Sequence, residues 1–502
     1  MRLSGRLSAA IAVLEDFEGR RVPLKTALAD WARGARYAGA KDRAWISGLC
    51  LDVLRKRNSL GAAMGDETPR AAALGALGLL WRMPLAEIGE AAAEVPHGPG
   101  ALTELEHLVL SRGPVARQTP PESSASPSPM GRGDRGEGRA VAALSHRTHP
   151  DSLGWNGPAA SAPSPPTPLP KGEGSPGVAP PHVLGDFPEW LTPHMTRAFG
   201  EHAAEEGAAL SARADVDLRV NALKTTPEKA LDAIRSIGGE ALPILTTALR
   251  IPAPDASEKT PAVTVIPAFN KGWFEVQDLG SQIAAAAAGA IKGQQVLDYC
   301  AGGGGKTLAL AALMENKGQL YAWDDDARRL QPLYERARRA GVRNLQIRNP
   351  AGGDGLDDLA GRMDVVFVDA PCTGSGAWRR HPDTKWRLTP QQLAARMAEQ
   401  DAILAAAAPF AKPGGRLVYV TCSIFMEENE DRIDAFLAAH PDFASAPAFD
   451  QIAISGILTD EGRAALEECR VADDASRLTP ARLRCDGFFI AVMQQKNVDR
   501  VR

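Results

Sequence analysis

The chain is 502 residues long, with 44% hydrophobic and 24% charged residues and a net charge of −4. Because domains usually contain roughly 100 to 200 residues, this length predicts about three domains. No apolar run approaches the roughly 18 residues that span a bilayer, so we expect no membrane partner. The six cysteines include no C-x-x-C pair and are too few for a disulfide framework. Reduced thiols, no bound metal and a cytoplasmic location are therefore expected.

Positive charge is concentrated at the amino-terminal end. Residues 1–60 contain 12 Lys or Arg and 6 Asp or Glu, which leaves a net charge of −10 for the rest of the chain. Such a basic region can meet nucleic-acid phosphates. On charge alone, however, an ordinary solvated helix surface is the simpler explanation.

The first third of the chain divides into two segments of different composition. Residues 1–110 are rich in Ala, Leu and Arg, and their apolar residues recur at helical spacing. This pattern predicts an all-helical domain. Residues 111–185 are rich in Pro, Ser and Gly and contain too few large apolar residues to offset the entropy lost on folding. They predict a disordered linker.

A small α+β domain is predicted for residues 186–280. Candidate helices cover residues 190–207 and 227–237, and strand-like stretches cover residues 218–220 and 262–266. The mixture of short helices and strands resembles an RNA-recognition fold.

Residues 281–495 alternate between strands and helices. The predicted strands are residues 295–299, 319–323, 345–348, 364–369, 416–421 and 487–493. Alternation of this kind is typical of a mainly parallel sheet with helices on both faces. The sequence therefore predicts an α/β, doubly wound, Rossmann-like domain.

A glycine-rich loop joins the first of these strands to a helix. It comprises Cys300, Ala301, Gly302, Gly303, Gly304, Gly305 and Lys306, which are candidate cofactor-binding residues. Glycines allow the backbone to approach a ligand, and helix N–H groups can meet it. Asp324 follows Gly302 by 22 residues, near the spacing at which a carboxylate binds ribose hydroxyls, although a helix cap would also explain it. A dinucleotide-dependent oxidoreductase would show the same features.

Two cysteines follow strands that are expected to be neighbours in the sheet. Cys372 lies three residues after Asp369 at the end of one strand, and Cys422 ends the next. A thiolate that adds to carbon 6 of a pyrimidine makes carbon 5 nucleophilic, and a carboxyl group at N3 favours the addition. Two thiols, a carboxylate and a methyl donor would therefore suit methylation of carbon 5. Small buried cysteines at strand ends are the alternative.

Five motifs in this order resemble the Sun-type RNA cytosine-5 methyltransferases, most of all the bacterial ribosomal RNA enzymes among them. The motifs are FEVQDLGSQIAA from Phe274, DYCAGGGGKT from Asp298, DAPCTGSGAWRRHPD from Asp369, TCSIFMEENE from Thr421 and DGFFIA from Asp486. The resemblance covers about residues 186–493. Residues 1–110 resemble the NusB-like helical domain of these enzymes, and residues 281–495 their class I methyltransferase domain.

The resemblance implies methyl transfer from S-adenosylmethionine to carbon 5 of a cytosine in structured RNA. Small-subunit ribosomal RNA is the expected substrate and transfer RNA the alternative. The family uses the T-C-S cysteine as nucleophile and the P-C cysteine to help release the product, which assigns these roles to Cys422 and Cys372. Asp369 would recognise the ring and border the cofactor, whose binding site the family places on the glycine loop and at Asp324. Spacing alone does not distinguish the two cysteines.

The chain departs from the family pattern at three places. Gly303 stands where the family usually has proline, which predicts a softer loop and weaker cofactor binding. Asn349 stands where many members have aspartate, with Asp354 nearby as an alternative contact on the adenine side. The insert at residues 111–185 is atypical and expected to be harmless to catalysis. An inactive RNA-binding or ribosome-assembly factor that keeps the fold is the alternative function.

Cations and aromatic rings after the P-C motif predict a contact with RNA. The residues are Arg379, Arg380, His381, Lys385 and Trp386. Cations can bind phosphate, and flat rings can stack on an extruded base. A loop with core tryptophans is the alternative. We expect a monomer whose partner is RNA.

Overall fold

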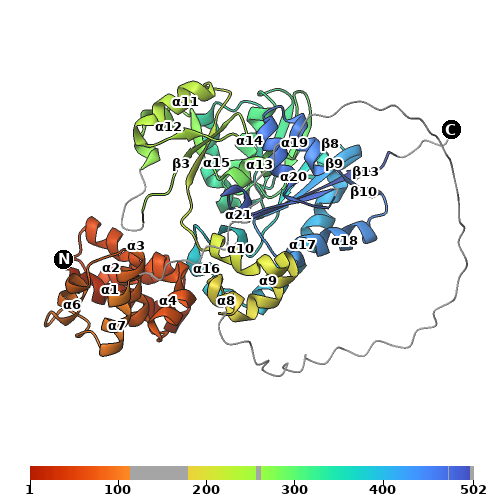
Figure 1. The fold of residues 1–502 in the computed structure, drawn as a ribbon. Helices are drawn as coiled ribbons and strands as arrows, with labels where there is room; N and C mark the ends of the chain where they lie inside the picture. Colours follow the sequence, from red (N-terminus) through yellow and green to blue (C-terminus); the bar gives the residue numbers. More distant parts are fainter. Residues whose placement is uncertain (114–178, 256–261, 473, 498–502) are drawn as a thin grey trace, which may run out of the picture. The chain divides into compact units, whose positions relative to one another are not determined.

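The computed structural model describes all residues except 114–178, 256–261, 473 and 498–502 (Figure 1). Most of the predicted linker, residues 111–185, thus lies outside the described residues. The linker prediction is wrong at its end, because α8 (Pro181–Leu184) is helical, with proline at the first helical position. No described helix has the length and apolar character needed to cross a membrane.

The amino-terminal region is all-helical, as predicted. Its helices are α1 (Leu3–Arg20), α2 (Leu24–Gly34), α3 (Ala40–Arg55), α4 (Arg57–Met64), α5 (Pro69–Gly75), the π-helix η1 (Ala76–Leu80), α6 (Leu85–Ala93) and α7 (Glu104–Arg112). The apolar faces of α1, α3 and α5 meet in one core around Leu14, Leu49 and Leu74. Helical spacing of apolar residues in the sequence produces this core.

The helix predicted for residues 190–207 is interrupted. The structure has η2 (Glu189–Leu191), α9 (Thr192–Phe199), η3 (Gly200–His202) and α10 (Ala203–Leu210). Gly200 ends α9 with a φ of 58°, a conformation that glycine adopts readily. The chain therefore turns at Gly200 before α10 begins.

A four-stranded antiparallel sheet forms the small α+β region. Its order is β2-β3-β1-β4, with β1 (Val216–Val220), β2 (Glu240–Ala241), β3 (Ala248–Ile251) and β4 (Phe274–Val276). The helices are α11 (Pro227–Ile234), η4 (Arg235–Ile237), η5 (Val263–Val265) and α12 (Pro267–Asn270). The strand predicted at residues 262–266 is wrong. Its valines favour a strand by propensity, but Val265 is 74% exposed and the segment forms the 3-10 helix η5.

The large sheet confirms the predicted doubly wound α/β fold. Its strands are β5 (Gln295–Asp298), β6 (Gln319–Trp323), β7 (Leu345–Arg348), β8 (Met363–Asp369), β9 (Ala411–Thr421), β10 (Phe443–Ala446), β11 (Arg470–Ala472), β12 (Ala475–Leu478) and β13 (Phe488–Gln495). The order is β11-β12-β13-β9-β8-β5-β6-β7, and β10 pairs with β13. The six predicted strands are present. Sequence analysis missed β10, β11 and β12, which are only three or four residues long.

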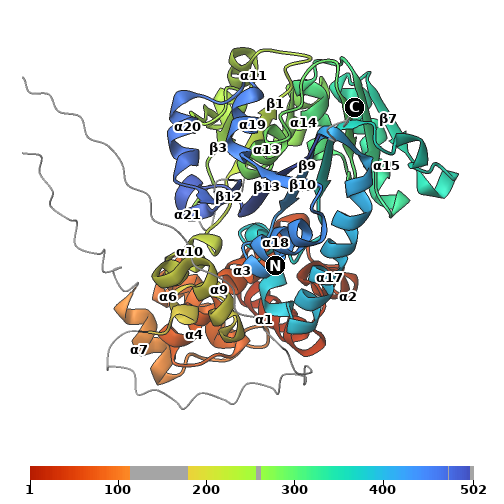
Figure 2. The same cartoon turned by 90° about the vertical axis from the view of Figure 1, so that its right-hand side faces the viewer.

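Helices cover both faces of this sheet (Figures 1 and 2). They are α13 (Leu279–Ala286), α14 (Gly305–Leu313), α15 (Ala327–Ala340), α17 (Pro390–Ala407), α18 (Glu430–Ala439), α19 (Ala448–Ile454), α20 (Asp460–Glu467) and α21 (Pro480–Leu483), whereas α16 (Pro382–Arg387) packs against α3 of the amino-terminal region. Val365 packs with Ile283 of α13 on one face, and the next residue, Val366, packs with Leu404 of α17 on the other. Alternating side chains of β8 thus enter two separate cores.

The strand order reverses between β5 and β8. From β5 the parallel strands continue through β6 to β7 on one side, and through β8 to β9 on the other. In open α/β sheets, ligands bind outside the carboxyl ends of the strands at such a point. The loops that follow β5, β6, β8 and β9 are therefore the expected location of a ligand-binding site.

Candidate active site

The structure brings Cys372 and Cys422 together at the predicted sheet edge. Strands β8 and β9 are parallel neighbours, with Asp369 opposite Val420. The two Sγ atoms lie 3.4 Å apart in a hydrogen bond. Both residues are partly exposed, so that a substrate can approach them.

The contact between the sulfur atoms affects the ionisation of Cys372. The hydrogen bond with Cys422 raises the pKa of Cys372 well above its usual value, and burial adds to this effect. Cys372 therefore keeps its proton and can donate it in a hydrogen bond to the sulfur of Cys422. An S–H donor of this kind stabilises a neighbouring thiolate.

A buried cation lies beside the cysteine pair. Lys306, the second residue of α14, donates from Nζ to Asp369 Oδ2 at 2.7 Å, and Nζ lies 5.0 Å from the centre of the Phe488 ring. Burial lowers the pKa of Lys306, but the charges of Asp369 and Cys422 outweigh it and leave the pKa above its usual value. Lys306 is thus a permanent cation near Cys422, although sequence analysis assigned it to the cofactor.

A buried glutamate joins the two cysteine loops. Glu428 ends the 3-10 helix η10 (Met426–Glu428) and is fully buried. Its Oε1 accepts a hydrogen bond from the N–H of Thr373 at 2.8 Å, and its Oε2 accepts from the Ser423 hydroxyl. Gln400 Nε2 donates to Oε1 at 3.1 Å. Sequence analysis missed Glu428, because nothing in the spacing of the motif shows that one carboxylate holds both loops.

The glycine loop is shaped by local backbone constraints. Gly304 is the N-cap of α14 with a φ of 80°, and a Cβ there would lie 2.1 Å from Leu333 Cδ1. Only glycine fits both conditions. The N–H of Gly302 donates to Asp324 Oδ2 at 3.0 Å, so the predicted ribose-binding carboxylate is anchored to the loop.

An aspartate that sequence analysis did not assign lies beneath the loop. Asp298 ends β5 and is 1% exposed, and its Oδ2 accepts a hydrogen bond from the Thr307 hydroxyl at 2.6 Å. Within the described residues Oδ1 is buried and has no hydrogen-bond partner. Burial raises the pKa of Asp298 to about 7. Its position directly before the glycine loop was the signal that could have identified Asp298 as a candidate site residue.

A cavity of about 250 Å³ opens next to this loop. Its lining includes Tyr299, Cys300, Trp323, Asp324, Asp325, Ile403 and Pro371. The rings of Tyr299 and Trp323 lie 4.7 Å apart, centre to centre. Apolar and aromatic walls beside a carboxylate and a glycine loop fit the base, the ribose hydroxyls and the close backbone contact of S-adenosylmethionine.

The predicted adenine-side residues lie elsewhere. Asn349 and Asp354 are not among the residues that line the cavity. Asn349 Oδ1 accepts a hydrogen bond from the N–H of Ala351, and Asp354 Oδ2 accepts from the N–H of Asn349. The two side chains thus stabilise their own turn. Asp325 lines the cavity.

Gly303 is held by a guanidinium from another part of the chain. Arg336 of α15 donates from Nη1 to the Gly303 carbonyl oxygen and from Nη2 to Glu275 Oε2 at 3.2 Å. Glu275 is buried in β4 and also accepts from Arg339. The loop, which lacks the usual proline, is therefore restrained from outside.

Replacing Arg336 with methionine is expected to weaken cofactor binding without slowing chemistry. The lost charge-assisted hydrogen bond corresponds to a roughly 3- to 10-fold rise in the Kd for S-adenosylmethionine. The Kd is measured by calorimetry and kcat at saturating cofactor. Arg338→Met, an exposed change on the same helix, is the control. An unchanged Kd in Arg336→Met would show that the restraint has no effect.

Two residues predicted to contact RNA are paired inside the protein. Arg379 is 3% exposed and donates to Asp486 Oδ1 at 3.2 Å. Arg380 donates to Asp486 and to Asp278, both at 2.7 Å. Carboxylates distant in sequence thus engage both guanidinium groups; Arg379 is buried, whereas Arg380 remains partly exposed.

Two further predicted RNA contacts join α16 to the helical region. Lys385 is fully buried, and its Nζ donates to the carbonyl oxygen of Arg55 at 3.1 Å and to Ser211 Oγ at 2.8 Å. Burial lowers the pKa of Lys385 to about 7. Trp386 Nε1 donates to the Leu54 carbonyl oxygen at 2.6 Å. Lys385 is therefore used inside the protein, whereas Trp386 is partly exposed and His381 is exposed.

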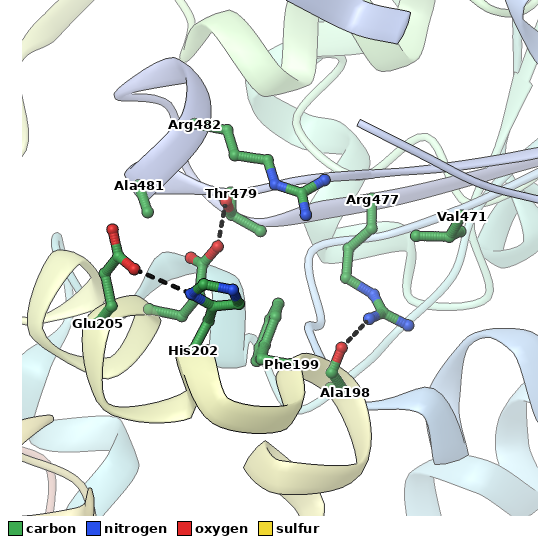
Figure 3. Close-up of a pocket in the computed structure, with 10 residues that line it drawn as sticks. Ala198, Phe199, His202, Glu205, Val471, Arg477, Thr479, Ala481 and Arg482 are labelled. Carbon is green, nitrogen blue, oxygen red and sulfur yellow. Dashed lines mark hydrogen bonds and ion pairs between the residues drawn. The ribbon is translucent and has the colours of Figure 1, made fainter. Parts of the chain in front are cut away.

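A larger cavity of about 350 Å³ lies between α9–α10 and β12–α21 (Figure 3). Arg477 donates to the Ala198 carbonyl oxygen at 2.7 Å, His202 pairs with Glu205 at 3.2 Å, and Thr479 donates to Glu206 Oε1 at 2.9 Å. None of the predicted site residues lines this cavity. It is therefore separate from the site described above.

Comparisons with known proteins agree on one family. A family model described as 16S rRNA methyltransferase RsmB/F matches residues 289–494, and an RsmF/B-like, ferredoxin-like domain matches residues 187–256. The probable ribosomal RNA small subunit methyltransferase B of Synechocystis sp. is 32% identical over 314 residues, which cover 62% of this chain and 67% of that protein. Ribosomal RNA small subunit methyltransferase B of Erwinia tasmaniensis is 35% identical over 261 residues, 51% of this chain and 58% of that protein.

Solved structures share the fold. The crystal structure of PH0851 covers 99% of this chain and 99% of its own at a TM-score of 0.62 and 22% identity. The structure of NSun6 from Pyrococcus horikoshii with SFG covers 63% of this chain and 100% of its own, with a TM-score of 0.50 and 21% identity. Both likenesses concern the fold alone.

The doubly wound sheet and the glycine loop define a Rossmann-like nucleotide-binding fold, and the family matches make it a methyltransferase that uses S-adenosylmethionine. The matches to the family models and to the Synechocystis protein show which methyltransferase family this is. The chain belongs to the RsmB/F family of 16S rRNA methyltransferases. Its substrate is therefore an RNA.

Proposed function

We propose that the protein methylates carbon 5 of a cytosine in small-subunit ribosomal RNA, with Cys422 as a covalent catalyst. The observation that carries the proposal is the pair of thiols 3.4 Å apart at the sheet edge, next to the cofactor cavity. A dinucleotide-dependent oxidoreductase has no use for two such cysteines. An inactive assembly factor would not need the intact set of Cys372, Cys422, Lys306 and Asp369.

The glycine loop and Asp324 would hold S-adenosylmethionine, which would supply the electrophilic methyl group. The protein's task is to make carbon 5 nucleophilic. The Lys306 cation and the S–H group of Cys372 both stabilise a negative charge on the sulfur of Cys422. Cys422 rather than Cys372 is therefore the nucleophile.

The thiolate of Cys422 adds to carbon 6 of the cytosine and forms a carbon–sulfur bond. The electrons of the double bond between carbons 5 and 6 move toward carbon 5 and the rest of the ring. Asp369, held by Lys306, can accept a hydrogen bond from the amino group at carbon 4 as a carboxylate, and in its protonated form it donates a proton to N3 and so favours the addition. This step uses only side chains that the structure places at one edge.

Cys372 completes the cycle. Once the sulfur of Cys422 is bonded to carbon, the hydrogen bond and the charge that raise the pKa of Cys372 are lost. Cys372 can then release its proton to solvent and, as a thiolate, take the proton from carbon 5. The electrons of that C–H bond restore the ring double bond, and Cys422 leaves as a thiolate.

The remaining expectations are part of this proposal. We expect a monomer that acts in the cytoplasm and needs no metal ion. Within the part of the chain that the structure describes, no group of three His, Cys, Asp or Glu side chains could hold a metal. Ribosomal RNA is preferred over transfer RNA as the substrate, in line with the names of the relatives.

The proposal is tested by incubating the purified protein with labelled S-adenosylmethionine and unmodified RNA. In vitro transcribed 16S rRNA is expected to acquire label as 5-methylcytosine, located by bisulfite sequencing, whereas a transfer RNA pool is expected to acquire none. Label found in transfer RNA alone would show that transfer RNA, and not 16S rRNA, is the substrate. No label in either RNA, with cofactor binding intact, would contradict the enzymatic function.

A further inference from the structure

A second cavity borders the reacting sulfur atoms. It has a volume of about 180 Å³ and is lined by Cys372, Thr373, Thr384, Arg387, Leu388, Gln392 and Arg396. The residue before Cys372, Pro371, lines the cofactor cavity instead. The two cavities thus lie on either side of one dipeptide, and a ligand in the second would contact Cys372.

Two arginines line the second cavity. Arg387 reaches it from the last turn of α16 and Arg396 from α17, while none of the lining residues is acidic. Arg387 Nη2 donates to Asp383 at 3.2 Å, and Arg396 Nη1 donates to Glu399. A guanidinium has five N–H donors, so one carboxylate partner leaves donors on each arginine for a further acceptor.

The chemistry of the cavity fits a phosphodiester. Two guanidinium groups, two threonine hydroxyls and a glutamine amide offer hydrogen-bond donors around a space beside Cys372. Arginine binds phosphate oxygens with a geometry that matches them well. A nucleotide extruded from structured RNA brings its flanking phosphates to the mouth of the active site.

The charge distribution adds a second argument. The chain has a net charge of −4, so contact with RNA depends on local groups of cations. Among the cations predicted for this role, Arg379 and Lys385 are buried, and Arg380 is held by two carboxylates, those of Asp278 and Asp486. We infer that Arg387 and Arg396 bind a backbone phosphate of the RNA next to the reacting cytosine. The inference rests on the proposed RNA methylation.

The test compares variants in RNA binding at several salt concentrations. Arg387→Gln and Arg396→Gln are each expected to weaken binding of in vitro transcribed 16S rRNA and to reduce the slope of log K against log salt by about 1. The KM for RNA rises, while kcat at saturating RNA and the Kd for S-adenosylmethionine stay the same. Arg387→Lys and Arg396→Lys, which retain the charge, recover most of the slope.

Arg362→Gln is the matched control. Arg362 is exposed directly before β8, at the sheet edge opposite the cysteines, and is expected to keep the wild-type slope. Wild-type slopes in both glutamine variants, or a loss confined to kcat, would overturn the inference. If the wild-type protein binds RNA but transfers no methyl group, the proposed function fails, and the slopes still decide whether the two arginines bind phosphate.

Discussion

Replacing Cys422 with alanine is expected to lower kcat for methyl transfer by roughly four orders of magnitude, because no other group then activates carbon 5. Cys422 directly follows β9, forms a hydrogen bond with Cys372 and lies near the Lys306 cation. Cofactor binding should stay within about twofold, since Cys422 does not line the cofactor cavity. Rates are measured with labelled S-adenosylmethionine and 16S rRNA.

Replacing Cys372 with alanine is expected to have a different effect. The adduct with Cys422 still forms, but the base that removes the proton from carbon 5 is missing. Protein covalently bound to RNA should therefore accumulate and appear as a slowly migrating band in denaturing gels. The double variant Cys372→Ala/Cys422→Ala, which cannot form the bond, is the control. Equal loss of activity without any adduct in both single variants would refute the assignment of roles.

Replacing Lys306 with methionine is expected to reduce kcat by roughly 100-fold or more and to move the rise of the pH–rate profile to higher pH. Burial lowers the pKa of Lys306, but Asp369 and Cys422 keep it above its usual value, so the wild-type cation persists throughout the neutral range. Methionine keeps much of the length but removes the charge that favours the anion of Cys422. The profile is measured between about pH 6 and 10, the range around the usual thiol pKa.

Lys292→Met is the matched control for this variant. Lys292 is half-exposed and pairs with Glu315 on the surface, away from the cysteines. Its activity and pH profile should equal those of the wild type. A Lys306→Met protein that loses only affinity for S-adenosylmethionine, with an unchanged profile at saturation, would return Lys306 to the cofactor role predicted from sequence.

The fold could be predicted largely from local patterns. Each long strand of the large sheet carries its own run of apolar residues, and the helices between them have periodic apolar faces. Strand ends fix which residues reach the same edge, so the meeting of Cys372, Cys422 and Asp369 followed from the order of the strands. The short strands β10 to β12 carry too few residues for such a pattern.

Side-chain partners could not be predicted in this way. Arg379 and Arg380 resemble RNA-binding residues in sequence, but their carboxylates lie about a hundred residues away in either direction, at Asp278 and Asp486. Lys385 is neutralised in part by burial against the helical region. Only the folded chain reveals which charges are used internally, and therefore which remain for a ligand.

The same limit applies to the loops that hold the site. Glu428 binds Thr373 and Ser423 across 55 and 5 residues of sequence, and Arg336 reaches Gly303 across 33. The resemblance to a family gave the role of each cysteine, whereas the structure supplies a physical reason for it in the positions of Lys306 and of the S–H group of Cys372.

The most direct test of covalent catalysis by Cys422 uses 16S rRNA that contains 5-fluorocytidine. Fluorine at carbon 5 cannot leave as a proton would, so the bond between sulfur and carbon 6 persists after methyl transfer. Digestion of the trapped complex and mass spectrometry then identify the modified peptide. The account predicts that the nucleotide is attached to Cys422. Attachment to Cys372, or no attachment under conditions in which unmodified RNA is methylated, would contradict it.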